Sequence, residues 1–222
     1  MALKTGKIRE KNCQNILCAA EIEFVKHGFK GASMQAIADL AGLPKANVLY
    51  YFNTKQDLYC EVLANISARW DSPLDDISDH DEPAKVLTRY ICNKVDLAIR
   101  YPNASKIYAA EIIHGAPNLQ EQLRTSVRSW FREKTKIIDS WIALGKMDAV
   151  DPQLLIFMIW STTQHYADFE TQILTVSNKQ EYETEDIEAI KRFLCQVILK
   201  GIGLEPVFEK PLRAEEQFSC SL

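Results

Sequence analysis

The chain has 222 residues, of which 47% are hydrophobic, and its formal net charge is −4 at pH 7. It contains only eight glycines and eight prolines, which argues against a disordered chain or a loop-rich β protein. No apolar run approaches the roughly 18 residues that a membrane-spanning helix needs. The first residues are charged and lack an apolar stretch, so we expect no signal peptide.

Charge is distributed unevenly along the chain. Residues 1 to 55 contain eight basic and four acidic residues, a balance of +4, so the remaining residues carry −8. A basic first quarter joined to an acidic remainder predicts a DNA-contacting segment attached to a segment with a different role.

Apolar residues recur at helical spacing through almost the whole chain. The pattern predicts helices over residues 10–27, 33–40, 44–51, 54–70, 83–100, 103–114, 117–143, 152–177 and 183–202. Ser33 and Thr54 are placed to cap two of these helices, and Pro44 is tolerated in a first helical turn. No convincing strand pattern occurs, so the predicted fold class is all-α. Residues 71–82 are expected to form a polar loop and residues 205–222 a loose tail.

Residues 33–52 have the features of a helix-turn-helix. Gly42 can adopt the left-handed conformation required where one short helix ends and another leaves at a steep angle. The second helix then presents Lys45, Asn47 and Tyr51 outward, with Tyr50 nearby. Asparagine can read adenine edges, lysine can bind guanine or phosphate, and tyrosine hydroxyls suit phosphate oxygens. The pattern predicts a recognition helix for the major groove, with Lys55 as a clamp on the DNA backbone.

This stretch resembles the TetR family of one-component transcriptional regulators. The resemblance is carried by Gly28-Phe29, Ser33, Ile37-Ala38, Ala41-Gly42, and the run from Lys45 to Phe52 followed by Lys55 and Leu58. It implies a three-helix DNA-binding domain at 1–53, with Ser33 among its DNA contacts, and a ligand-binding and dimerisation domain at 54–204. It also implies a cytoplasmic homodimer that acts as a repressor on near-palindromic double-stranded DNA. The family usually has serine where this chain has Pro44, which leaves the start of the recognition helix open.

A second resemblance concerns the effector. The block from Trp160 to Phe169, together with residues 111–117, Tyr101-Pro102 and Trp70, is similar to regulators of pyrimidine use within the family. Trp160, Gln164 and Asp168 lie one helical turn apart and share a face. A tryptophan ring can stack on a planar base, and a glutamine amide can both donate to and accept from an imide edge. The predicted effector is a small planar molecule such as uracil or thymine. Its candidate contacts are Trp70, Tyr108, Glu111, Trp160 and Gln164.

Other interpretations of these residues stay open at the level of sequence. Core packing is the alternative for Trp70 and Trp160, and a dimer contact is the alternative for Gln164. An unrelated hydrophobic molecule is the alternative effector. Tyr108 and Glu111 are more often structural than ligand-binding. In this family the last two long helices pair with their copies, which implies a dimer seam along the final helix: Leu194, Val197, Ile198 and Ile202.

Catalytic and metal-binding alternatives have little support. The six cysteines have no C-x-x-C pair, which favours reduced thiols over a zinc site or a disulfide framework. Pairs of Cys92 or Cys195 with His114 or His165 lack a local motif, and no glycine-rich phosphate loop occurs. His80 between two aspartates is expected to be a solvated loop residue. We therefore predict no catalytic residue, no metal and no cofactor. A structural adaptor would not need the polar face around Gln164.

Overall fold

The computed structural model describes residues 2–71 and 74–208, and the chain is helical throughout these ranges without a strand. The all-α prediction is confirmed. The helices are α1 (Ala2–Gly31), α2 (Met34–Leu40), α3 (Lys45–Tyr51), α4 (Lys55–Asp71), α5 (Pro83–Arg100), α6 (Pro102–Ile113), α7 (Gln120–Gln122), a π-helical turn at Leu123–Val127, α8 (Arg128–Ala143), α9 (Pro152–Asp168), α10 (Glu170–Val176) and α11 (Thr184–Lys200). Of the predicted tail, residues 205–208 have no regular structure and residues 209–222 lie outside the described ranges.

Most predicted helix ends of the first quarter are confirmed, but α1 begins at Ala2 and not at residue 10. The backbone of Gly28 leaves the helical region, with φ 64° and ψ 173°. The Ser33 hydroxyl caps α2 by accepting a hydrogen bond from the Ala36 amide at 3.0 Å. Thr54 and Asp57 cap α4 reciprocally, each side chain accepting from the other residue's amide. Pro44 is the residue before α3 and offers no side-chain cap, so α3 begins at Lys45.

One predicted helix, over residues 152–177, is wrong because the structure divides it at Phe169. The backbone of Phe169 has φ −112° and ψ 23°, which separates α9 from α10. Contacts from α6 hold this break on both sides. Ser105 donates to Asp168 at 2.6 Å, and the Lys106 ammonium lies 2.7 Å from Glu170. These partners are more than 60 residues away in sequence, so local periodicity does not reveal them.

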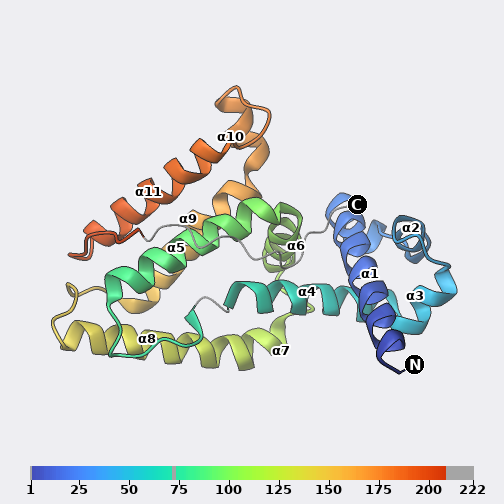
Figure 1. Ribbon diagram of the computed structural model, residues 1–222, viewed down its shortest axis with the longest axis horizontal. Coiled ribbons are helices and arrows are strands. Elements are labelled where there is room, and N and C mark those ends of the chain that lie inside the picture. Colours follow the sequence, from blue (N-terminus) through green and yellow to red (C-terminus); the bar gives the residue numbers. More distant parts are fainter. Residues whose placement is uncertain (1, 72–73, 209–222) are drawn as a thin grey trace.

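Two hydrophobic cores organise the molecule. The N-terminal core is built by α1 to α4 together with Ala104, Ile107, Ala116 and Leu119 from α6 and the segment after it. The C-terminal core is built mainly by α5, α8, α9 and α11. Figure 1 shows α1 to α3 at one end of the molecule, with α4 running from them into the helical body and α6 standing between α1 and α9.

Three contacts tie the N-terminal helices to the body. Glu21 on α1 binds the Arg69 guanidinium on α4 at 2.6 Å. The same guanidinium lies 5.1 Å from the centroid of the Tyr101 ring, which precedes α6. Tyr59 on α4 donates to the buried Glu111 on α6 at 3.1 Å. A change in the position of α4 or α6 is therefore transmitted to α1.

Candidate DNA-binding and effector sites

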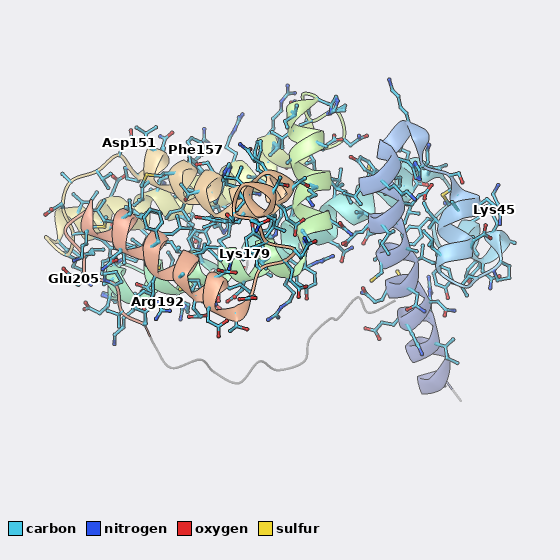
Figure 2. The ribbon with its side chains drawn as sticks, turned by 90° about the horizontal axis from the view of Figure 1, so that it is seen from above. Lys45, Asp151, Phe157, Lys179, Arg192 and Glu205 are labelled. Carbon is cyan, nitrogen blue, oxygen red and sulfur yellow. The ribbon has the colours of Figure 1, made fainter. Side chains whose placement is uncertain are left out.

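Helix α3 presents a polar face to solvent. Val48 is fully buried against the N-terminal core, whereas Lys45 and Asn47 are exposed and the Tyr50 side chain is 75% exposed. Gly42 supports this orientation with φ 65°, the left-handed value that the turn requires. In Figure 2, Lys45 lies at the opposite end of the molecule from Phe157 and Arg192. The three polar side chains thus protrude from one tip of the structure.

The remaining predicted DNA-binding residues make contacts within the chain as well. The Tyr51 hydroxyl accepts from Asn12 of α1 at 3.4 Å, and its ring meets Tyr50 edge to face. The Lys55 ammonium donates to the carbonyl oxygens of Lys30 and Ala32 at 3.3 and 2.8 Å and lies over the Phe29 ring. An ammonium has three donors, so two of them close the end of α1 and one remains unused in these contacts.

Trp160 lies within an aromatic group at the edge of the C-terminal core. Its ring stacks near Trp130, with centroids 6.1 Å apart, and contacts Phe131 and Phe157 at 5.9 and 5.8 Å. Its indole nitrogen donates to the Tyr90 hydroxyl of α5 at 2.7 Å. Trp160 is half-buried, so part of its side chain is exposed to solvent.

Gln164 lies one turn beyond Trp160 on α9 and is half-buried. Within the described ranges its amide has no hydrogen-bond partner. Asp168, a further turn on, is instead engaged by Ser105. Burial raises the pKa of the Asp168 carboxyl, while the hydrogen bond from Ser105 acts in the opposite direction. Of the three polar positions predicted on this face, Gln164 is the one whose hydrogen-bonding groups are unused.

Trp70 belongs to the N-terminal core and is 8% exposed. Its ring meets Tyr108 of α6 edge to face at 5.0 Å, and the Lys94 ammonium of α5 lies 4.9 Å from its centroid. Three residues before Trp70, the Ser67 hydroxyl is buried without a hydrogen-bond partner among the described residues. A buried unpaired hydroxyl is uncommon in a folded protein and requires an explanation.

Trp70 and Trp160, the two tryptophans predicted to contact the effector, do not contact each other. Trp160 packs on the C-terminal core and Trp70 in the N-terminal core, and α5 connects them. Tyr90 binds Trp160, and Lys94, one turn further along α5, covers Trp70. Sequence reasoning missed both α5 residues and Ser67. A signal existed for Lys94, because a lysine interrupts the apolar stripe of α5 between Tyr90 and Ala98.

Glu111 makes structural contacts rather than facing an open site. The buried carboxylate accepts from the Tyr59 hydroxyl at 3.1 Å, from the Asn118 amide nitrogen at 2.6 Å and from the Asn118 side chain at 3.2 Å. Gln56 of α4 donates to the same asparagine side chain. Burial, and next the Glu111 charge, raise the pKa of the Tyr59 phenol. These bonds join α4, α6 and the segment after α6.

Exposed apolar side chains concentrate on the last helices. On α9 they are Leu154, Phe157 and Met158, and on α11 they are Phe193 and Val197. The predicted seam on α11 needs correction, because Leu194, Ile198 and Ile202 are buried in the C-terminal core of the same chain. Val197 alone of the four predicted residues is exposed, at 57%.

Comparison with known proteins identifies both parts of the chain. Residues 16–62 match the family model described as bacterial regulatory proteins, tetR family, and residues 63–205 match the model of the YcdC-like protein, C-terminal region. The chain belongs to the TetR family of transcriptional regulators. It is a DNA-binding regulator of helix-turn-helix type and not an enzyme, as the sequence predicted.

Individual relatives agree with this membership. The TetR-family chain is 38% identical over 191 residues to the HTH-type transcriptional regulator RutR of Escherichia coli O157:H7, covering 84% of this chain and 88% of RutR. RutR of strain K12 is 37% identical over the same length. Among solved structures, the ketosteroid transcriptional regulator KstR2 of Mycobacterium tuberculosis is 17% identical with a TM-score of 0.62, covering 84% of this chain and 92% of KstR2. At that identity the likeness to KstR2 supports the fold alone.

Within 2–71 and 74–208, no group of three or more His, Cys, Asp or Glu side chains is arranged to hold a metal ion. Over the same ranges, no helix combines the length and the apolar character needed to cross a membrane.

Proposed function

We propose that this regulator is a cytoplasmic homodimeric repressor that leaves a near-palindromic operator when a uracil- or thymine-like pyrimidine binds to it. In this proposal, residues 1–53 form the DNA-binding domain. Residues 54–204 form the domain that binds the effector and dimerises. Double-stranded DNA meets the α3 face of each protomer through Lys45, Asn47 and Tyr50. Ser33, Tyr51 and Lys55 serve the phosphate backbone. Ser33 can do so because its hydroxyl oxygen caps α2 while its proton is free to donate.

The unused amide of Gln164 beside the Trp160 indole is the observation that carries the effector class. The Gln164 side chain is half-buried, and its amide makes no hydrogen bond within the described residues. Both its donor and its acceptor are therefore free to pair with a ligand that displaces the water around them. An imide edge offers one donor and two acceptors, which suits a glutamine amide. The resemblance of the 160–169 block to regulators of pyrimidine use supports the same class.

Trp70, Tyr108, Lys94 and the unpaired Ser67 hydroxyl form the second half of this proposed site, one turn further along the same face of α5. A pyrimidine that contacts side chains on α4, α5 and α9 would change how α4 sits against the body. Because α4 is bonded to α1 through Arg69 and Glu21, that change reaches the DNA-reading end. The two DNA-binding domains of a dimer bind two operator half-sites. The centres of these half-sites lie one helical turn of DNA apart, ~34–36 Å, or a multiple of that distance.

An unrelated hydrophobic effector is the second candidate. The aromatic group of Trp130, Phe131, Phe157 and Trp160 favours it, because stacked rings accept many apolar molecules. The two candidate effectors differ in whether the Gln164 amide contributes to binding. A pyrimidine forms hydrogen bonds with this amide, whereas an apolar ligand forms none.

Thermal unfolding with added ligand tests the effector class directly. We expect uracil at about 100 times its Kd to raise the free energy of unfolding by roughly 2.7 kcal/mol. A purine base and a steroid, added as controls, should leave the transition unchanged. Stabilisation by the steroid without stabilisation by uracil would favour the hydrophobic-effector alternative.

Replacement of Asn47 tests the recognition face. Asn47→Ala should weaken binding to a selected operator by about 1–3 kcal/mol, the contribution of a good base contact. Binding to unrelated duplex DNA should be unchanged, since Asn47 is exposed and supports no packing in the described structure. Fluorescence anisotropy on both duplexes measures the difference. Equal losses on both would mean that Asn47 contacts the DNA backbone instead.

A further inference from the structure

Two thiols face each other across the interface between α5 and α11. The Sγ atoms of Cys92 and Cys195 are 3.9 Å apart. Cys195 is fully buried and its thiol donates to the carbonyl oxygen of Thr88 at 3.9 Å, whereas Cys92 is partly exposed. One thiol is therefore open to a small reagent in solution and the other is held directly behind it.

The register of the two helices is fixed on either side of this thiol pair. Lys191, one turn before Cys195 on α11, binds Asp96, one turn after Cys92 on α5, at 2.7 Å. Thr88, one turn before Cys92, accepts the Cys195 thiol on the other side. The helices thus run antiparallel with matching positions one turn apart. A bond between the two sulfurs requires a local approach from 3.9 Å to about 2.05 Å.

The electrostatic surroundings favour Cys92 as the reactive partner. The contact with the Cys195 thiol lowers the pKa of the Cys92 thiol, and the Lys191 ammonium acts in the same direction against the effect of burial. Cys195 has a raised pKa, because of its contact with Cys92 and because it is buried. A partly exposed thiol with a lowered pKa beside a buried thiol with a raised pKa is an asymmetry typical of reversible redox sites.

We propose that Cys92 and Cys195 are a redox pair that a hydroperoxide converts to an intramolecular disulfide between α5 and α11. The Cys92 thiolate attacks one peroxide oxygen, the O–O bond breaks, and Cys92 sulfenic acid and hydroxide form. The Cys195 sulfur then attacks the sulfenic sulfur, the S–O bond breaks, and the Cys195 proton leaves with the oxygen as water. In total, two thiols lose two protons and two electrons, and hydrogen peroxide becomes two molecules of water. A cellular thiol reverses the reaction by exchange.

The bond would link the proposed effector site to the helix that carries the exposed apolar face. Tyr90 and Lys94 flank Cys92 on α5, while Phe193 and Val197 flank Cys195 on α11. A covalent link holds α5 in the position described here relative to α11. If effector binding moves α5, which rests on the function proposed above, the oxidised protein needs more effector to release DNA.

Peptide mapping tests the chemistry without reference to function. Reduced full-length protein is treated with hydrogen peroxide, blocked with iodoacetamide and digested with trypsin. We expect peptides 90–94 and 193–200 to appear joined, and to separate after dithiothreitol. The joined peptides should be absent from Cys195→Ser. Alkylation of Cys92 and Cys195 as free thiols, under conditions that oxidise the exposed Cys60, would overturn the redox pair.

Operator release by uracil tests the consequence. Oxidised wild type should need about fivefold more uracil for half-release, the lower end of ordinary coupling between two sites. Cys195→Ser should respond alike before and after peroxide. A joined peptide without any shift in half-release would overturn the coupling while leaving the disulfide intact. Absence of release by uracil in the reduced protein would refute the proposed effector and not the thiol pair.

Discussion

Replacement of Val197 by glutamate should abolish the dimer. Val197 is 57% exposed on α11, next to the exposed Phe193 one turn away, and large apolar side chains in this position indicate a surface that another protein covers. A carboxylate buried there without a partner costs about 3–5 kcal/mol, which weakens dimerisation roughly a hundredfold or more. Analytical ultracentrifugation should show monomers at micromolar concentration, and binding to the full palindrome should fall to that of a half-site.

Leu144→Glu provides the matched control for this substitution. Leu144 is similarly exposed, at 60%, but lies at the end of α8 rather than on the α9 and α11 face. The control should remain dimeric. If Val197→Glu were dimeric as well, the proposed dimer would have to use another surface.

Replacement of Glu111 by leucine should destabilise the fold severely. The substitution leaves the buried Tyr59 hydroxyl and the partly buried backbone amide of Asn118 without their acceptor. Each unsatisfied group costs about 1–3 kcal/mol, so the free energy of unfolding should fall by roughly 2–6 kcal/mol. Urea unfolding followed by circular dichroism measures the loss.

Two control variants separate this structural role from ligand binding. Glu111→Gln keeps one acceptor oxygen and should cost less than the leucine substitution. Glu121→Leu, an exposed glutamate on α7, should change stability by no more than about 0.5 kcal/mol. If the Glu111→Leu protein has normal stability but no longer responds to the effector, Glu111 must contribute to effector binding instead.

Local chemistry in the sequence was sufficient to predict the DNA-reading end. A cap at Ser33, a left-handed glycine at Gly42 and a polar face after Pro44 are short-range features, and each acts through neighbouring residues. The break between α9 and α10 was not predictable in this way. It depends on Ser105 and Lys106, which α6 brings to Asp168 and Glu170 across more than 60 residues.

The proposed effector site shows the same distinction. The shared face of Trp160 and Gln164 follows from helical spacing, and the lysine within the apolar stripe of α5 is a sequence signal for Lys94. The position of Ser67 depends on how α4 packs, and no local pattern predicts it. Apolar periodicity also failed to separate the exposed face of α11 from its core face, because Leu194, Ile198 and Val197 look alike in sequence while two of them are buried.

Titration of the operator complex with uracil, on wild type and on Gln164→Leu, tests the central claim most directly. Leucine has similar bulk but neither donates nor accepts a hydrogen bond, so an imide edge at this position loses about 1–3 kcal/mol per unpaired group. Wild type should be released by uracil. The variant should fold, dimerise and bind the operator normally but stay bound throughout the titration. Gln153→Leu, an exposed glutamine at the start of α9, should behave as wild type. Equal release of wild type and Gln164→Leu by uracil would contradict the proposed site, and no release of wild type would contradict a pyrimidine effector.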